Sequence, residues 1–161
     1  MIILGIDPGT ATTGYGIIQK NGQEIKIIDY GCILTPANLP LPDRLLIISK
    51  DLRRIIKKFK PDQVAVEELF FAANSKTAIA VGHARGVLLL ESKRSNLATF
   101  EYTPLEVKVA LTGYGRADKN QVQQMVKCLL SLSKIPKPDD AADALAVAIC
   151  HANTFDDSRI N

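Results

Sequence analysis

The first 34 residues contain three β-like segments joined by short turns, and they constrain the fold more than any other part of the chain. The segments are residues 2–7 (IILGID), 15–19 (YGIIQ) and 24–34 (EIKIIDYGCIL). Asn21-Gly22, between the second and third segments, is a strong hairpin signal. We therefore predict that the chain begins with a three-stranded antiparallel meander.

The rest of the chain alternates helical and extended patterns. A proline-rich stretch, TPANLPLPD, leads into an amphipathic helix over residues 43–60. The later elements expected are a strand at 63–68, a helix at 74–94, a strand at 98–103, a helix from Pro104 to Gly113, a helix at 119–131 with Asp118 as N-cap, and a last helix from Asp139 or Asp140. This order predicts a single α/β domain over residues 1–161, ending in a loose tail of about eight residues. Its five-stranded mixed sheet should have the order 3-2-1-4-5, with helices on both faces.

The composition fits one globular domain. The chain has 161 residues, of which 47% are hydrophobic and 23% charged, with a formal net charge of +3. This mild basic excess suits a nucleic-acid partner without requiring one. The apolar run before Gly5 is too short for a signal peptide or a membrane span, so we expect a cytoplasmic protein with no membrane partner. Cys32, Cys128 and Cys150 have no CxxC spacing and are expected to be buried, reduced thiols.

Carboxylates follow two of the expected strands and also open the last helix. If the first and fourth strands are parallel neighbours, Asp7 and either Glu67 or Glu68 lie at one sheet edge, roughly 5–8 Å apart. Asp140 and Asp143 project from one face of the last helix because they are three residues apart. The alanines around them should let this helix press closely against the sheet. Four carboxylates can thus converge.

Such a cluster suits a divalent metal. Hard oxygen ligands without thiolates favour Mg²⁺ or Mn²⁺, and two such ions can activate water and stabilise the leaving oxygen of a phosphodiester. The tight turn after Asp7 could add backbone amides and the Thr10 hydroxyl as phosphate contacts. The pattern predicts metal-dependent phosphoryl transfer to water.

Each acid also has a simpler explanation. Asp7 could form the turn before Pro8, Glu68 could be a solvated strand end, and Asp139 or Asp140 could cap the last helix. Together these explanations are less economical, because DDAAD places three acids within five residues of an alanine-rich, core-facing helix. There is neither a GxGxxG sequence nor a Walker A motif, which disfavours a nucleotide-binding fold of either kind.

Four long motifs resemble the RuvC family of bacterial crossover junction endodeoxyribonucleases, in order and along almost the whole chain. They are ILGIDPGTATTGYGII, VAVEELFFAANSKTAIAVGHARGVLL, FEYTPLEVKVALTGYGRADKNQVQQMV and DDAADALAVAICH. The resemblance implies a ribonuclease H-like fold and a homodimer that makes paired symmetric nicks in Holliday junctions during DNA recombination and repair. It also implies Mg²⁺ as the cofactor, with Mn²⁺ as a substitute and two ions in each active site. A branch-migration helicase complex is a further implied partner.

The resemblance assigns a role to each matching position. Asp7, Glu67, Asp140 and Asp143 correspond to the metal ligands, which leaves Asp139 as an extra acid and an expected N-cap. Lys108 and Lys119 correspond to basic residues near the scissile phosphate. Phe70 corresponds to the aromatic residue that stacks on an unpaired base, with Phe71 as the competing candidate.

Other candidates carry weaker signals. Lys76, Arg85 and Arg116 are candidate DNA contacts, although a solvated charged face explains such residues as simply. His83, with glycines on either side, is expected on a packing or dimer face. His151 lies about two turns beyond Asp143 and is expected to be structural.

Three alternative functions remain at this point. A ribosomal-RNA-processing nuclease of the same fold opens with a similar strand but lacks the DDAADALA helix. An actin-like ATPase or sugar kinase shares the DPGT-like turn but needs two lobes and a much longer chain. A non-catalytic DNA-binding scaffold would be expected to lack an acid, whereas all four are present here.

Overall fold

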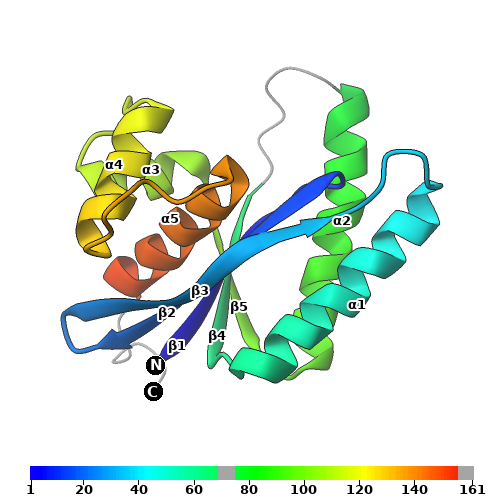
Figure 1. Cartoon of the computed structure of the whole chain (residues 1–161), viewed down its shortest axis with the longest axis horizontal. Helices are drawn as coiled ribbons and strands as arrows, with labels where there is room; N and C mark the ends of the chain where they lie inside the picture. The colour runs from blue at the N-terminus through cyan, green and yellow to red at the C-terminus, as the bar shows by residue number, and fades with distance from the viewer. Residues whose placement is uncertain (69–74, 156–161) are drawn as a thin grey trace.

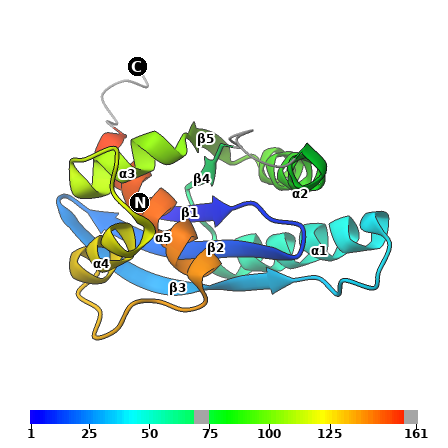
Figure 2. The same ribbon diagram turned by 90° about the horizontal axis from the view of Figure 1, so that it is seen from above.

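The computed structural model describes residues 1–68 and 75–155, which form one mixed five-stranded sheet covered by helices. The strands are β1 (Ile2–Asp7), β2 (Thr12–Asn21), β3 (Glu24–Leu34), β4 (Gln63–Glu67) and β5 (Ala98–Tyr102). Their order is β3-β2-β1-β4-β5, as expected from the sequence, and it can be followed across Figure 2. β1, β2 and β3 pair antiparallel, and β4 runs parallel to both β1 and β5. The meander and the strand order are confirmed.

The second strand is longer than the sequence pattern indicates. β2 begins at Thr12 rather than Tyr15, because Thr12 and Thr13 pair with Leu34 and Ile33 of β3. Threonine and glycine gave no apolar signal there, so pairing with β3 and not propensity extends the strand. At its other end the predicted turn is present, with Gly22 at a φ of 59° that favours glycine.

The helices lie in two groups on opposite faces of the sheet (Figure 1). α1 (Leu41–Phe59) and α2 (Ser75–Arg94) cover one face, and α3 (Pro104–Thr112), α4 (Lys119–Leu129) and α5 (Asp139–Thr154) cover the other. Each face of the sheet therefore has its own apolar core.

Within residues 1–68 and 75–155, no helix combines the length and apolar character needed to cross a membrane.

Alternation along the strands decides which residues meet which helices. Leu4 and Ile6 of β1 pack in the core beneath α1 and α2, whereas Ile3 packs in the core shared with α5. Because successive side chains point to opposite faces, Asp7 shares the α5 face with Ile3 and Gly5. The same alternation in β4 puts Glu67 on the α5 face, with Ala65. The two strand-end acids therefore face the same helix.

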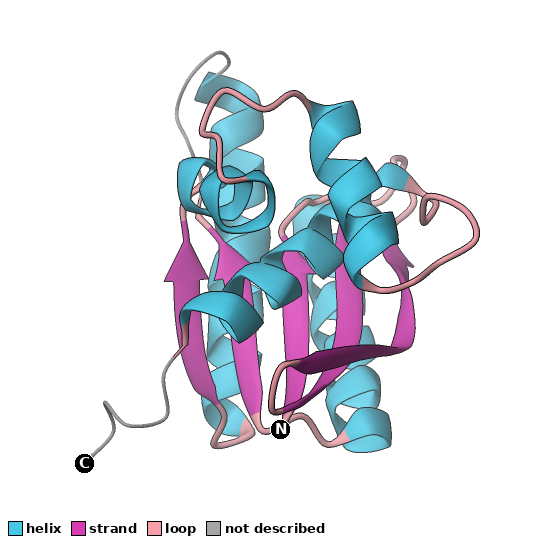
Figure 3. Ribbon diagram, turned by 90° about the vertical axis from the view of Figure 1, so that its left-hand side faces the viewer, coloured by secondary structure: helices cyan, strands magenta, loops and turns pink. Residues whose placement is uncertain are grey.

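α5 crosses in front of the sheet (Figure 3), and its backbone lies close to two glycines of the strands. A Cβ built on Gly5 would lie 2.2 Å from the backbone oxygen of Ala144, and one on Gly14 would lie 1.9 Å from that of Asp140. Both distances are far inside van der Waals contact, so only glycine fits. These glycines and the alanines of α5 allow the helix backbone to rest on the strands.

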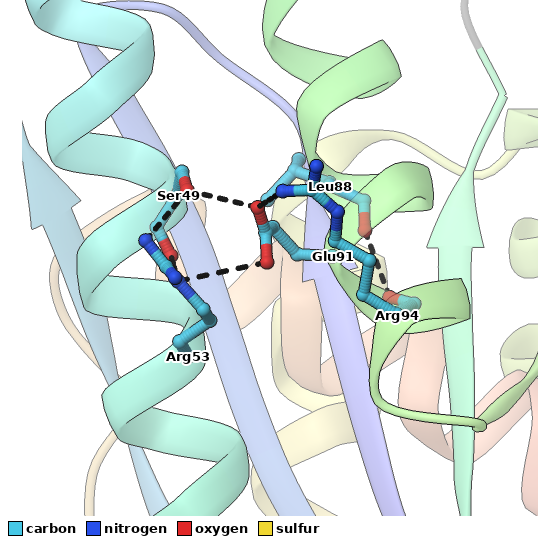
Figure 4. Close-up of polar contacts among 6 residues, drawn as sticks. Ser49, Arg53, Leu88, Glu91 and Arg94 are labelled. Atoms are coloured by element: carbon cyan, nitrogen blue, oxygen red, sulfur yellow. Dashed lines mark hydrogen bonds and ion pairs between the residues drawn. The ribbon is translucent and has the colours of Figure 1, made fainter.

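A buried carboxylate joins the two helices of the other face (Figure 4). Glu91 of α2 is only 2% exposed, and it accepts a hydrogen bond from Ser49 of α1 at 2.9 Å. Arg94 donates to the same oxygen at 3.2 Å, and Arg53 lies 3.6 Å from the other oxygen. A buried charge needs such partners, so this cluster fixes how α1 and α2 pack together.

Most helix ends agree with the sequence, and one expected cap is wrong. Asp118 caps α4 as expected, with its side chain accepting from the amide of Gln121. Asp139, however, is the first residue of α5, and Pro138 holds the N-cap position without a side-chain bond. The Asp139 carboxylate instead accepts a hydrogen bond from Lys137 at 2.5 Å. It therefore acts as a charge in the first helical turn, where the helix dipole favours an acid.

The cysteine prediction is only partly correct. All three thiols are free, but only Cys150 is buried, whereas Cys32 is half-buried and Cys128 is exposed. Cys128 lies on the solvent-facing side of α4. A single small side chain in the sequence does not indicate which side of the helix it occupies. Burial raises the pKa of Cys150 to about 12, so this thiol is unreactive.

Candidate active site

Three separate parts of the chain bring acids to one end of the sheet. Asp7 is the last residue of β1 and Glu67 is the last residue of β4, and these strands are parallel neighbours. Asp140 and Asp143 occupy the first turns of α5, whose start lies against Gly14, the β2 residue paired with Asp7. The expected convergence of the four carboxylates is present in the structure.

The carboxylates of the site interact electrostatically. Burial is the main cause that raises the pKa of Asp7 to about 8, and the negative charges of Glu67, Asp143 and Asp140 raise it further. Burial, followed by the charge of Asp143, also raises the pKa of Glu67. The pKa of Asp143 is raised chiefly by burial. Like charges held this close favour either a bound proton or a bound cation.

A lysine contacts the same group of acids. Lys119, the first residue of α4, donates to Asp143 at 2.7 Å and lies 3.8 Å from Asp139. Burial works against its charge, but the bond to Asp143 and the nearby acids raise the pKa of Lys119 above its ordinary value. Lys119 therefore keeps its positive charge at the edge of the site.

Lys108 completes this side of the cleft. It lies on α3, with its side chain half-buried, and lines a pocket of about 200 Å³ together with Glu67, Lys119 and Asp143. Its positive charge lowers the pKa of Glu67 against the effect of burial. Both lysines that the family resemblance singled out thus lie beside the acids.

The donor set is suitable for a hard divalent cation, although the acids do not form a closed cage. In the described part of the chain, no three acidic, histidine or cysteine side chains are close enough together to hold an ion as they stand. Asp143 is engaged by Lys119 instead. All four acids offer carboxylate oxygens, the ligand type that Mg²⁺ and Mn²⁺ prefer. Their role as metal ligands stays a prediction, supported by donor chemistry and by crowding of negative charge.

The Thr10 hydroxyl is not available to a phosphate. It donates to the backbone oxygen of Ala80 in α2 at 2.7 Å, and the residue is only 7% exposed. A phosphate oxygen needs a donor, and the hydroxyl hydrogen is already used. Thr10 instead ties the turn after β1 to α2.

The remaining candidates are divided between described and undescribed positions. Phe70 and Phe71 lie outside the described residues, and so does the side chain of Lys76. Arg85 is paired with Glu101 of β5, which occupies its charge within the chain. Arg116 is exposed in the loop between α3 and α4. The structure leaves the proposed DNA contacts of these residues as predictions.

The two histidines are not among the residues that line the acidic site. His151 is fully buried in α5, where its ring nitrogens lie 2.7 Å from Gln63 Oε1 and from the Tyr102 hydroxyl. It also packs against Phe100 and Phe155, so the expected structural role fits its surroundings. His83 is exposed on α2, and its expected place on a packing or dimer face stays a prediction.

Strand order, parallel strand-end acids and the acidic start of α5 together define a nuclease of the ribonuclease H-like class. The comparisons with known proteins narrow this class to one family. Residues 3–151 match the family model "Crossover junction endodeoxyribonuclease RuvC". The chain belongs to the crossover junction endodeoxyribonuclease RuvC family, and it is an enzyme.

Individual relatives agree with this family. The RuvC endonuclease of Alkaliphilus oremlandii is 62% identical over 154 residues, covering 96% of this chain and 94% of the relative. That of Caldicellulosiruptor saccharolyticus is 62% identical over 152 residues, covering 94% and 92%. The structure of Thermus thermophilus RuvC in complex with a Holliday junction substrate matches with a TM-score of 0.90 at 34% identity, covering 95% of this chain and 93% of that one.

Proposed function

We propose that this endonuclease resolves Holliday junctions by metal-dependent hydrolysis, with Asp7, Glu67, Asp140 and Asp143 as the metal ligands. The observation that carries the proposal is the meeting of acids from three distant parts of the chain at one sheet edge, where they raise one another's pKa. The junction as substrate is supported by the family and by the Thermus complex. A net charge of +3 suits a polyanionic substrate.

Each protein group has a separate part in the reaction. Bound Mg²⁺ or Mn²⁺, as two ions, would supply an activated water and stabilise the leaving oxygen. The acids fix where cations can sit, and burial of Asp7 and Glu67 keeps bulk water from weakening these contacts. Lys119 orients Asp143 through its 2.7 Å bond, and together with Lys108 it offers positive charge to the phosphate undergoing attack.

The direct test uses a synthetic four-way junction with a fixed centre. In Mg²⁺ the protein should nick two opposed strands at symmetric positions, while a linear duplex of the same sequence and a precursor ribosomal RNA stay intact. A chelator should abolish nicking. Equal cutting of duplex and junction, or cutting in the presence of the chelator, would contradict the proposal.

Membership of the RuvC family favours this function over the three alternatives, which are an RNA-processing nuclease, an actin-like ATPase or sugar kinase, and a non-catalytic DNA-binding scaffold.

Paired nicks need two active sites, and α2 offers a surface for a second copy of the chain. Ile79 and Leu90 are 62% and 50% exposed, and with His83 and Gly86 they follow the spacing of one helix face. A Cβ built on Gly86 would meet nothing within 4 Å, so the face is open to a close partner. We infer a homodimer through this face of α2.

The dimer predicts a clear effect of charge on α2. A double variant, Ile79→Glu with Leu90→Glu, should weaken self-association by at least about 10³-fold, because four large apolar side chains per dimer would lose their burial. Light scattering after size exclusion would measure the mass. Leu46→Glu on α1, which is 48% exposed, is the matched control and should leave the mass unchanged. A monomeric wild-type protein at working concentration would overturn the assignment.

The finer biological setting follows from the same proposal. A nuclease acting on bacterial recombination intermediates would work in the cytoplasm, where the chromosome lies. A branch-migration helicase is the partner expected from the family resemblance. Binding of that helicase to a junction occupied by this protein would be the relevant measurement.

A further inference from the structure

We propose that Arg44 binds a backbone phosphate of the DNA strand being cut, next to the scissile phosphate and across the carboxylates from Lys119. The inference rests on the proposed function, because it assigns a substrate contact to the same cleft. It adds a binding residue outside the motifs that pointed to the site, on the first turn of α1.

Arg44 borders a pocket that Asp140, one of the four acids of the site, also lines. The pocket has a volume of about 530 Å³. Its other lining residues are Gly9, Thr10, Ala11 and Thr12 of the turn after β1, and Ala80 and Val81 of α2. Figure 2 shows this turn and the start of α1 at the same end of the sheet. The lining residues are small and mainly apolar, so the pocket has room for a sugar of the DNA backbone. Arg44 supplies the positive charge of the pocket.

Hydrogen bonds hold the guanidinium in place. Arg44 Nε donates to Thr35 Oγ1 at 2.8 Å, and Thr35 Oγ1 donates to the backbone oxygen of Thr10 at 2.5 Å. Thr35 is 7% exposed, and its amide also donates to the oxygen of Ala11 at 3.0 Å. Arg44 is thus tied to the turn that directly follows Asp7. The Nε anchor leaves both Nη groups free to donate to an anion.

The charge of Arg44 has no acidic partner in the described part of the chain, where no carboxylate lies within 4.0 Å of it. By contrast, Arg53, Arg54, Arg85 and Arg94 all have one. Arg44 is half-buried, which makes an unpaired charge more costly than at the open surface. A phosphate satisfies the charge and the donor geometry together.

Two pockets each combine acids of the site with positively charged side chains. One holds Lys108 and Lys119 beside Glu67 and Asp143, and the other holds Arg44 beside Asp140. A strand laid over the acids would therefore meet a cation on both sides. This arrangement aligns the strand through its phosphates while the acids act on the bond between them.

The first experiment measures junction binding without divalent ions as salt is varied. Arg44→Gln should bind about 10-fold more weakly at 0.1 M salt, and the slope of log affinity against log salt should become shallower by about 0.9. Arg54→Gln is the matched control, since it removes the same charge from the same helix at a side chain that is 80% exposed and paired with Asp51. The control should leave the slope unchanged.

A purely structural role for Arg44 gives a different result. If Arg44→Gln lowers the melting temperature but keeps the wild-type slope and affinity, the proposal is overturned. Arg44→Lys keeps the charge without the Nε bond, so it should retain the slope and part of the affinity. If the salt slope of Arg44→Lys became as shallow as that expected for Arg44→Gln, this result would also contradict a phosphate contact.

The second experiment changes the DNA instead of the protein. A neutral methylphosphonate placed at one of the two phosphates beside the scissile one should weaken wild-type binding about 10-fold and Arg44→Gln binding no further. If neither position affects wild-type binding, the inference fails even where Arg44→Gln does not fold. Wild-type nicking of the junction in Mg²⁺ reports separately on the proposed function, so the two failures can be told apart.

Discussion

Asp7→Asn should bind a four-way junction with nearly wild-type affinity and nick it at least about 10³-fold more slowly in Mg²⁺. Asp7 lies at the centre of the acids, and its carboxylate is affected by Glu67, Asp143 and Asp140 together. An amide offers one neutral oxygen in place of a charged group, so it cannot hold a divalent ion as strongly. Affinity should persist because contacts to phosphates elsewhere provide most of it. Single-turnover nicking and gel-shift titration would measure the two quantities.

The same variant provides its own control for folding. Burial first, and then the charges of Glu67, Asp143 and Asp140, raise the pKa of Asp7 to about 8, so the fold favours the protonated acid. Its stabilising contribution is complete below pH 4 and is lost as the pH rises through 8. Metal-free Asp7→Asn should therefore be more stable than wild type at pH 9, on the order of 3 kcal/mol, with the difference shrinking toward pH 5. Mg²⁺ should stabilise the wild type more than the variant.

Two results would contradict these roles. Robust nicking by Asp7→Asn would remove Asp7 from the reaction. A melting temperature that responds to pH equally in wild type and variant would mean that Asp7 does not carry the unfavourable charge. Thermal melts between pH 5 and 9, with and without Mg²⁺, would separate the two.

Gly14→Ala should both destabilise the fold and inactivate the enzyme. The added Cβ would lie 1.9 Å from the backbone oxygen of Asp140, and a backbone atom cannot rotate away as a side chain can. We expect a loss of about 3 kcal/mol, or roughly 6–12 °C in melting temperature. Nicking should fall by about 10²-fold, because any shift of α5 moves Asp140 and Asp143 out of place.

Gly115→Ala is the matched control for this substitution. Its Cβ would also be close to a neighbour, 2.6 Å from Leu105 Cδ1, but that atom is the end of a flexible side chain that is 60% exposed. Its cost should stay below about 1 kcal/mol. If Gly14→Ala melted and nicked like wild type, α5 could not rest on β2 as closely as described.

The central acids were predictable because simple periodic rules place them. Alternation along β1 and β4 puts Asp7 and Glu67 on one face, and a parallel pairing puts them at one edge. Helical spacing puts Asp140 and Asp143 together on α5. The glycines at positions 5, 14 and 16 carry a further signal, but its meaning depends on the helix that packs against them.

Arg44 and Thr35 escaped the sequence reading for a physical reason. Arg44 lies in the first turn of an amphipathic helix rich in lysine and arginine, so from the sequence its charge resembles part of a solvated face. Only the bond to Thr35, and the path from Thr35 to the turn after Asp7, set it apart. The same limit applies to Asp139, whose expected cap was replaced by Pro138.

By itself the sequence determined the strand order, the sidedness of the strand-end acids and the spacing of the helical pair, since these follow from local periodicity and short connections. The tertiary structure alone decided how closely α5 rests on the glycines, which charges are paired and which cation faces the cleft. Those features depend on contacts between residues far apart in the chain, and local sequence carries no record of such distances.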